Sequence, residues 1–483
     1  MIKKYFALLL GLILILGLSW RINQERSLSL HFVDEEDHIS GASLINRGYR
    51  LHEQIQSNHQ PLVYFGSAAI QKLTQPDNIF MLIRRHRQAV FVYGALWSLL
   101  IVLRFSYPGL IFVFFFEWLK YGLLGNLLLM ESLAVYPAVY IFFNLLEQKI
   151  PKTLELVFLG FSGFLILFNL VPLWPWLGLM LLLILLKVKK QIVWLIAGLI
   201  VPALILFSFY SPIAWFRETV YNNWLYAIPA LNQIKTLADW LKIIGFPFTA
   251  FSATNSLQAQ FISLFFVTYL LAAWFNRKLL WLYPVLLLAN NRVLSPAAAY
   301  YEGFHLLPWL GLLITIFAFF GAKLKLKFIL PLTIWAVILL LNKNMPYFNK
   351  TDPDYEYYVN YSTIDDYNFA VKNIASSSDR LAVTANWPLL HWQTAPQLAT
   401  RQLVYYGWEP GVPELKADYQ RVFFGDNPPE IIYGNDEPVL LSQKYVNIIR
   451  HGKPTELFVR SDRFAKITDS QWAALLTRGF GKK

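Results

Sequence analysis

The sequence predicts a polytopic α-helical membrane protein that carries a small soluble α/β domain at its C-terminal end. Of the 483 residues, 56% are hydrophobic and only 15% are charged, whereas soluble proteins average about 25% charged residues. Long apolar runs recur between residues 5 and 342, and the composition beyond them becomes polar and charge-balanced. A bilayer is therefore the expected solvent for most of the chain.

The apolar runs predict about eleven transmembrane helices, although a few are short for a hydrocarbon core of roughly 30 Å. No small-residue cleavage site follows the first run, so we expect an uncleaved first span instead of a signal peptide. The weakest of the set is the run at 279–291. The runs cover residues 5–20, 88–103, 108–128, 130–146, 153–170, 172–186, 191–210, 260–275, 279–291, 304–320 and 328–342.

Basic residues alternate along the chain as the positive-inside rule requires. If the N-terminus is cytoplasmic, the inner loops carry lysine and arginine, and the short outer connections near Asn126 and Pro172 carry none. An odd number of crossings then places the C-terminal domain on the outer side. The expected localisation is the cytoplasmic membrane, with many passes and an extracytoplasmic C-terminal domain.

We divide the chain at residue 342. The expected membrane domain, residues 1–342, includes a long first outer loop at 21–87 with interfacial helices. The expected soluble domain, residues 343–483, contains strand-like segments at 379–385 and 430–433 and helical spacing at 363–375. Alternating strand and helix signals at this pitch favour a compact α/β unit.

The formal net charge of +12 does not indicate a nucleic-acid partner. Beyond residue 341 there are sixteen Lys and Arg and sixteen Asp and Glu, so the whole excess lies in the membrane part. Basic residues there normally fix topology, and membrane lipids are the expected partners. The absence of cysteine excludes disulfides, thiolate nucleophiles and cysteine metal ligands.

The strongest chemical feature is the acidic segment Phe32-Val-Asp-Glu-Glu-Asp-His38, a few residues beyond the first apolar run. Adjacent carboxylates can orient an acceptor hydroxyl, remove its proton or hold a divalent metal. On a helix, Asp34 and His38 would share one face. Taken alone, the segment is better explained as a solvated acidic loop.

Two further motifs follow the acids in the same loop, Ile39-Ser-Gly-Ala-Ser-Leu-Ile-Asn-Arg-Gly48-Tyr49 and His59-Gln-Pro-Leu-Val-Tyr64-Phe65. This order resembles the C-type glycosyltransferase superfamily (the GT-C fold), polytopic enzymes that use lipid-phosphate sugars. In that superfamily a first-loop acidic pair precedes a helix, a glycine turn and a His/Lys-x-Pro-hydrophobic-Tyr stretch. The likeness covers the first 150 residues best and the remaining spans and C-terminal domain more loosely.

The resemblance implies inverting transfer of a hexose or pentose from a polyprenyl-phosphate donor to a hydroxyl of a lipid, glycan or protein acceptor. The first-loop acid would act on the acceptor, as a base or through a metal. Asp34 is the first choice and Glu35 the second, while Glu36 and Asp37 allow another register. A divalent cation (Mg²⁺, Mn²⁺ or Zn²⁺) could be held at Asp34 and Glu35. Histidine ligands could come from His31, His38, His52 and His59, although their spacing matches no zinc motif.

Candidate substrate-binding residues lie in these motifs and further along the chain. An ionisable group at membrane depth, such as Glu131, is a functional candidate by default, and arginines can hold a phosphate through bidentate hydrogen bonds. The alternatives are an interfacial acid, arginines on lipid headgroups and a structural histidine. The candidates are His59, Tyr64, Arg84, Arg85, Glu131, Arg292 and His305.

Three other function classes remain open at this point, together with one structural expectation. A ligase or polymerase that uses a diphosphate-linked glycan more often places its reactive loop late in the chain, whereas the acids here come early. A transporter or flippase of a lipid-linked glycan would need ionisable residues near the midplane and often repeated halves, and the chain shows no repeat. A non-catalytic glycolipid-binding relative would keep the fold without the transfer. Glu117 and Lys120, three residues apart, are expected to form a self-neutralising pair.

Overall fold

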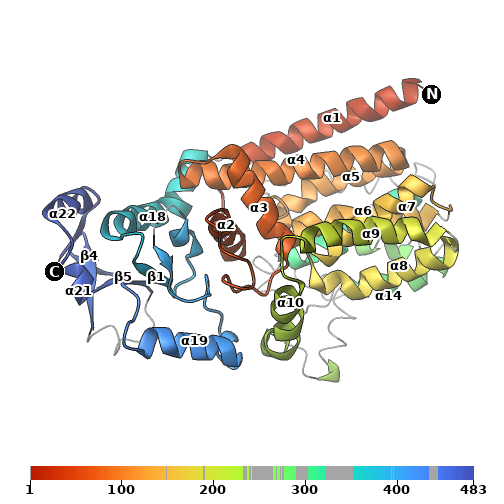
Figure 1. Cartoon of the computed structure of the whole chain (residues 1–483). Coiled ribbons are helices and arrows are strands. Elements are labelled where there is room, and N and C mark those ends of the chain that lie inside the picture. Colours follow the sequence, from red (N-terminus) through yellow and green to blue (C-terminus); the bar gives the residue numbers. More distant parts are fainter. Residues whose placement is uncertain are drawn as a thin grey trace. The chain divides into compact units, whose positions relative to one another are not determined.

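The computed structural model is mostly helical, with one small sheet (Figure 1). It describes residues 2–147, 149–188, 191–231, 236–238, 241, 265–267, 269–271, 273–274, 277–289, 303–321, 352–392, 394, 396–434 and 444–482. The chain forms two compact units. The helical unit consists of Met1–Ser27, Arg84–Phe209 and Gln233–Asp352, and the sheet unit of Leu28–Ile83, Tyr210–Asn232 and Pro353–Lys483.

Apolar helices packed on one another form the helical unit. Its central helices α6 and α16 are buried along most of their length, and Phe, Leu and Ile side chains from the surrounding helices complete one continuous core. The helices are α1 (Ile2–Glu25), most of α4 (Ile79–Phe105), α5 (Tyr107–Leu119), α6 (Met130–Glu147), α7 (Thr153–Leu167), α8 (Trp174–Val188), α9 (Ile192–Phe207), α14 (Leu282–Leu288) and α16 (Leu307–Gly321). The 3₁₀ turns are η1 (Lys120–Leu123), η2 (Val171–Leu173), η7 (Arg277–Trp281) and η8 (Gly303–Leu306).

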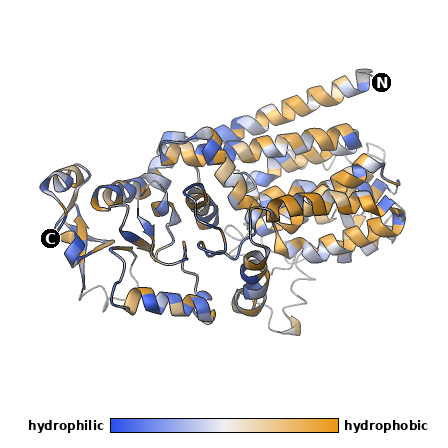
Figure 2. Cartoon of the chain, in the orientation of Figure 1, coloured by the Kyte–Doolittle hydropathy of each residue, from blue (hydrophilic) through white to orange (hydrophobic). Residues whose placement is uncertain are grey.

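These helices are hydrophobic on their exposed faces as well as on their buried faces (Figure 2). Phe6 on α1 and Leu204 on α9 are more than 60% exposed, which is unfavourable for aliphatic and aromatic side chains in water. Four helices in the described part of the chain are long and apolar enough to cross a bilayer: Lys4–Glu25, Ile79–Phe105, Val171–Val188 and Gly303–Phe320. The helical unit is therefore compatible with a membrane protein.

The predicted number of about eleven crossings is wrong for the described residues. Four helices qualify, or five if the bent pair Ile192–Phe207 and Pro212–Ala230 counts as one span. Several apolar runs form helices too short to cross, since the 13 residues of α5 extend only about 20 Å at 1.5 Å per residue. The run at 328–342 and half of the run at 260–275 lie outside the described residues.

The backbones of helices α7 and α9 approach each other closely at two glycines. A Cβ on Gly160 of α7 would come within 2.0 Å of the Leu195 carbonyl oxygen of α9, and one on Gly198 within 2.0 Å of the Val157 carbonyl oxygen. Small residues permit this kind of backbone approach between membrane helices.

The expected pair of Glu117 and Lys120 is confirmed. Both side chains are almost fully buried, and Lys120 Nζ lies 2.6 Å from Glu117 Oε2. Ser19 Oγ and Tyr136 Oη also donate hydrogen bonds to the carboxylate, at 2.8 and 2.5 Å. Because each charge is paired and hydrogen-bonded, the interior of the helical unit can hold it.

The sheet unit contains a six-stranded sheet in the order β2-β1-β3-β5-β4-β6. Strands β2, β1 and β3 are parallel, whereas β3, β5, β4 and β6 pair antiparallel. The predicted strands at 379–385 and 430–433 are confirmed as β1 and β3. The strands are β1 (Arg380–Val383), β2 (Gln397–Leu398), β3 (Ile431–Tyr433), β4 (Tyr445–Arg450), β5 (Lys453–Arg460) and β6 (Phe480–Gly481).

Helices cover both faces of this sheet (Figure 1). On one face α18 (Pro353–Ile374) and α22 (Asp469–Leu476) pack on alternate strand residues such as Leu381 and Val383. On the other face α19 (Pro413–Phe424) packs on Ala382 and Ile432. The period of two along the strands produces this three-layer arrangement, and the predicted helix at 363–375 is the C-terminal half of α18.

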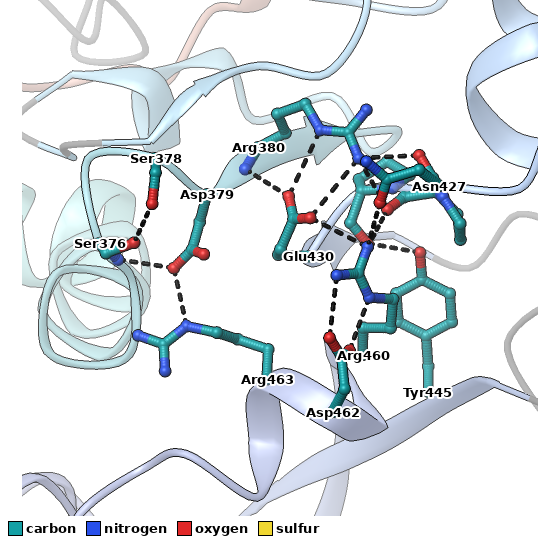
Figure 3. A network of polar contacts seen from close by, with 12 residues as sticks. Ser376, Ser378, Asp379, Arg380, Asn427, Glu430, Tyr445, Arg460, Asp462 and Arg463 are labelled. Atoms are coloured by element: carbon teal, nitrogen blue, oxygen red, sulfur yellow. Dashed lines mark hydrogen bonds and ion pairs between the residues drawn. The ribbon is translucent and has the colours of Figure 1, made fainter.

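Two acidic side chains hold the N-terminal ends of the parallel strands β1 and β3 (Figure 3). Glu430 accepts a hydrogen bond from the Arg380 backbone N at 2.8 Å and lies 2.9 Å from Arg460 Nη1. Asp379 accepts from Arg463 Nε at 2.8 Å. These contacts join β1, β3 and the end of β5, so they stabilise the sheet.

The first loop belongs to the sheet unit and not to the helical unit. Residues 28–83 contribute α2 (Val33–Asn46) and α3 (Pro61–Thr74). Arg47 Nη1 donates to the Thr394 carbonyl at 3.1 Å, Gln56 N to the Arg401 carbonyl at 2.7 Å, and Tyr361 Oη to the Leu30 carbonyl at 2.6 Å. The compact unit therefore combines the loop with the C-terminal region, whereas the predicted division at residue 342 separates them. The unit is completed by α10 (Pro212–Trp215), η4 (Phe216–Tyr221), η5 (Asn223–Ala227), α11 (Ile228–Leu231), η9 (Pro388–His391), η10 (Glu409–Gly411) and α21 (Ser461–Phe464).

Replacing either glycine of the α7–α9 contact should destabilise the helical unit. We expect Gly160→Ala and Gly198→Ala each to lower the free energy of unfolding by about 1–3 kcal/mol, because the added methyl would overlap a backbone carbonyl that cannot rotate away. The measurement is thermal unfolding of the detergent-solubilised protein. Gly178→Ala is the matched control, since a Cβ there meets nothing within 4 Å. Equal melting temperatures for all three variants would contradict the contact.

Candidate metal centre

The acidic segment of the first loop forms the beginning of helix α2. Asp34, Glu35 and Glu36 occupy its first turn, where the positive end of the helix dipole stabilises carboxylates. The helix ends at Asn46 with Arg47 as its C-cap, and Gly48 follows with φ of +95°, a left-handed conformation that glycine adopts without strain. The segment is therefore a structured helix and not a solvated loop, and it places Asp37 and His38 in a buried position.

The motif His59-Gln-Pro-Leu-Val-Tyr64 forms the start of α3. Pro61 occupies the first turn, a position where its missing N–H is not needed. The Tyr64 ring packs directly on α2 beside Gly41, where a Cβ would lie 2.6 Å from the ring. A mid-helix glycine is unfavourable by about 1 kcal/mol relative to alanine, and the approach of Tyr64 gives its physical reason.

Three metal-ligating side chains meet between the two motifs. His38 Nε2 lies 2.9 Å from His59 Nδ1, which lies 3.6 Å from Asp37 Oδ2. One donor atom from each residue falls within 4.8 Å of the other two, so this group can hold a metal ion. The three residues come from α2 and from the segment that leads into α3.

A chain of hydrogen bonds fixes the carboxylate of the group. Tyr64 Oη donates to Asp37 Oδ2, so Ser57 Oγ, 2.7 Å from Tyr64 Oη, must be the donor to that oxygen. The His59 backbone N–H donates in turn to Ser57 Oγ at 2.9 Å. Burial first, and then the charge of Asp37, raises the pKa of Tyr64 well above its usual value, so the phenol remains a donor.

His52 holds the backbone of His59 from the other side. Burial, reinforced by nearby Arg401, lowers the pKa of His52 to about 3, although the bond to His59 acts in the opposite direction. The ring is therefore neutral at physiological pH, with one N–H. Because His52 Nε2 lies 3.2 Å from the His59 carbonyl oxygen, that nitrogen carries the proton, and Nδ1 is left to accept from Tyr210 Oη.

Two buried polar atoms near Asp37 have no hydrogen-bond partner among the described residues. They are Tyr406 Oη and His391 Nε2. Burial, and then the charges of Asp37 and Asp34, raise the pKa of Tyr406. Burial and nearby Arg47 lower the pKa of His391 to about 3, against the opposing charge of Asp37. Unpaired buried polar atoms are unfavourable and call for a physical explanation, and a ligand at the Asp37 group would provide one.

The structure brings together some of the candidate residues of the first loop. His59 and Tyr64 join Asp37, the third alternative in the acidic register, whereas Asp34 and Glu35 lie one turn earlier on α2. Of the other histidines, His31 Nε2 lies 3.3 Å from Glu36 Oε2 and His52 supports His59. The arrangement therefore favours Asp37 as the acid at the centre of the site.

The remaining candidates belong to the helical unit. Glu131 and His305 meet there, with His305 Nδ1 2.6 Å from Glu131 Oε1. Arg84 donates to Gln24 at 3.1 Å, and Arg85 donates to Gln88 at 3.0 Å. Arg292 lies outside the described residues.

A separate groove of about 390 Å³ lies between the C-terminal ends of α2 and α3. Its lining includes Arg47, Lys72 and Trp392, and none of the residues of the Asp37 group. Arg47 is held by the Thr394 and Pro396 carbonyls, and Lys72 complements the partial negative charge at the C-terminal end of α3.

Sequence reasoning missed Ser57, Tyr406 and His391. The first lies two residues before His59, and the other two lie more than 300 residues from Asp37 along the chain. No local spacing could have identified the distant pair, because only the docking of α2 on the C-terminal region brings them near the acids.

Searches of protein-family models, curated proteins and solved structures find no match to this chain.

Glu409 is a buried acid of the sheet unit with a strongly shifted pKa. Burial raises the pKa of Glu409 to about 8, and the hydrogen bonds from Gln402 Nε2 and Tyr406 N only partly oppose this. The unfolded carboxyl has a pKa of about 4.5, so the folded state binds the proton more tightly. Its stabilising contribution is complete below pH 4.5 and is lost as the pH rises through 8.

The stability of the sheet unit should therefore fall between pH 6.5 and 8. The lowered pKa values of His52 and His391 change the stability only below pH 6.5, the pKa of an unfolded histidine. Deprotonation of Glu409 should therefore lower the free energy of unfolding by about 2 kcal/mol between pH 6.5 and 8. Glu409→Gln should flatten the decline in melting temperature. The exposed Glu414→Gln is the matched control, and an unchanged slope in Glu409→Gln would contradict the assignment.

Proposed function

We propose that the protein is an integral membrane glycosyltransferase that moves a sugar from a polyprenyl-phosphate donor to an acceptor hydroxyl on the outer face of a cytoplasmic membrane. One observation supports this most directly. The two motifs on which the resemblance to C-type glycosyltransferases rests meet in space, because Asp37 of the acidic segment lies against His59 and Tyr64 of the second motif.

The proposed reaction needs a base at the acceptor and positive charge at the leaving group. The acceptor oxygen forms a bond to the anomeric carbon, the bond from that carbon to the phosphate oxygen breaks, and the hydroxyl proton passes to a carboxylate. Attack on the face opposite the phosphate inverts the anomeric centre. We assign the carboxylate to Asp37, with Asp34 and Glu35 as the alternatives in the acidic segment.

The supporting groups of Asp37 suit this role. Tyr64 orients the carboxylate, and the buried surroundings strengthen its interaction with a hydroxyl. A divalent cation held by Asp37, His38 and His59 would supply Lewis-acid activation of the acceptor oxygen. For the departing phosphate and for the sugar or carrier, Arg84, Arg85, Arg292, Glu131 and His305 stay predictions from the sequence.

The proposal fits a lipid-linked donor for a physical reason. Nucleotide sugars remain in the cytosol, so sugar transfer on the outer face requires a donor carried by a membrane lipid. An enzyme for such a donor needs a hydrophobic body, which the helical unit provides, and a polar unit with acid and hydroxyl groups, which the sheet unit provides.

Asp37→Asn should lower sugar transfer by about 10²- to 10⁴-fold, the usual contribution of a general base, while the amide can still accept the hydrogen bond from Tyr64. The assay incubates membranes with radiolabelled polyprenyl-phosphate sugars and measures label that leaves the carrier lipid. Asp34→Asn, assayed in parallel, distinguishes the two registers of the acidic segment.

Asp77→Asn is the matched control, since Asp77 is an exposed acid of the same loop. Variants are compared at equal amounts of folded protein. Wild-type transfer that survives both Asp37→Asn and Asp34→Asn would contradict the proposed chemistry. Movement of lipid-linked glycan across vesicles without any transfer would favour a flippase instead.

A further inference from the structure

The Asp37 group has donor atoms of a particular chemical kind. Two imidazole nitrogens and one carboxylate oxygen are the ligands that Zn²⁺ and its neighbours in the first transition series prefer, whereas Mg²⁺ and Ca²⁺ favour sites made of oxygen. We propose that Asp37, His38 and His59 form a binding site for one transition-metal dication of the Zn²⁺ class, which discriminates against Mg²⁺. This inference does not depend on sugar transfer.

The distances between the donor atoms fit a tetrahedral ion. Two ligands at 2.0–2.1 Å from a tetrahedral Zn²⁺ are about 3.3 Å apart. The separation of the two histidine nitrogens is 2.9 Å, and the separation of His59 Nδ1 and Asp37 Oδ2 is 3.6 Å. These two values lie on either side of the ideal, and the donor atoms of all three residues lie within 4.8 Å of one another.

The protonation of the two rings is compatible with this role. The facing nitrogens, His38 Nε2 and His59 Nδ1, share one hydrogen at a separation of 2.9 Å. Coordination needs both lone pairs, so that hydrogen moves to the far nitrogen of its own ring. A neutral imidazole makes this tautomer change without losing a proton.

The ligands are supported by a surrounding set of hydrogen bonds. Tyr64 donates to Asp37, and the backbone of His59 is held by Ser57 at its N–H and by His52 at its carbonyl. Such outer contacts orient metal ligands and commonly change metal affinity by about 10–100-fold when removed. The carboxylates of the first turn of α2 also offset the charge of a dication.

Three protein ligands leave one position of a tetrahedron for a water or substrate oxygen, as in catalytic zinc sites. Tyr406 Oη is buried, has no partner in the described part of the chain, and lies close enough for the charge of Asp37 to act on it. A hydroxyl in this state can donate to an oxygen bound at the fourth position. The unpaired Tyr406 hydroxyl is therefore the candidate donor to an oxygen bound at this site.

The test is metal binding by the full-length chain, which is purified through an affinity tag that contains no histidine. After stripping with a chelator, the protein is titrated with Zn²⁺, Mn²⁺ and Mg²⁺, and bound metal is measured by mass spectrometry. We expect one equivalent of Zn²⁺ and an affinity for Mg²⁺ at least about 100-fold weaker. Substitution with Co²⁺ should give the visible absorption of a tetrahedral site.

His59→Gln should weaken Zn²⁺ binding by about 100-fold or more, because it removes a direct ligand. Tyr64→Phe should weaken it by about 10-fold, because it keeps the ring and removes the hydroxyl that bonds Asp37 and Ser57. His451→Ala is the matched control, since His451 is an exposed histidine of the β4–β5 turn. Melting temperatures establish that each variant is folded.

Three results would overturn the inference: no bound equivalent in the wild type, equal affinity in His59→Gln and His451→Ala, or Mg²⁺ binding as tight as Zn²⁺. Zinc binding without sugar transfer would support this inference and contradict the proposed function. Sugar transfer by a wild-type protein that binds no metal would support the proposed function and contradict this inference.

Discussion

The hydrogen bond from Tyr64 to Asp37 is the interaction on which the candidate site depends. It joins the two halves of the first loop, and it requires Gly41, because any side chain at that position would displace the Tyr64 ring from α2. With the ring in place, Ser57 and the His59 backbone complete a continuous chain of donors. The imidazole of His38 on α2 lies 2.9 Å from that of His59, which precedes α3.

Much of the site could be predicted from the sequence, but its centre could not. The sequence predicts the acidic segment and the His59–Tyr64 motif as candidate site residues, and both contribute to the cluster. The register was the uncertain part, because four consecutive acids can each face the partner helix after a rotation of about 100° per residue. Packing against Tyr64 selects Asp37, and that contact is 27 residues distant in sequence.

The fold was predictable where local patterns decide it. The strands β1 and β3 and the helix at 363–375 followed from alternation and helical spacing. The number of crossings could not be predicted in this way, because hydropathy measures whether a segment avoids water and not whether its helix is long enough to span a bilayer. Short helices such as α5 and α7 satisfy the same criterion by burial among other helices. The grouping of the first loop with the C-terminal region rests on contacts such as Tyr361 to Leu30, which no composition boundary indicates.

The sheet unit is assembled from three stretches of chain that are far apart in sequence, and this has a consequence for biosynthesis. After Ile83 has left the ribosome, 270 residues separate it from Pro353, where the segment that buries α2 begins. At about 5–20 residues per second, translation of that interval takes roughly 15–50 s. Throughout this time the nascent α2 and α3 lack the C-terminal surface that covers them in the folded unit, which the last quarter of the polypeptide supplies.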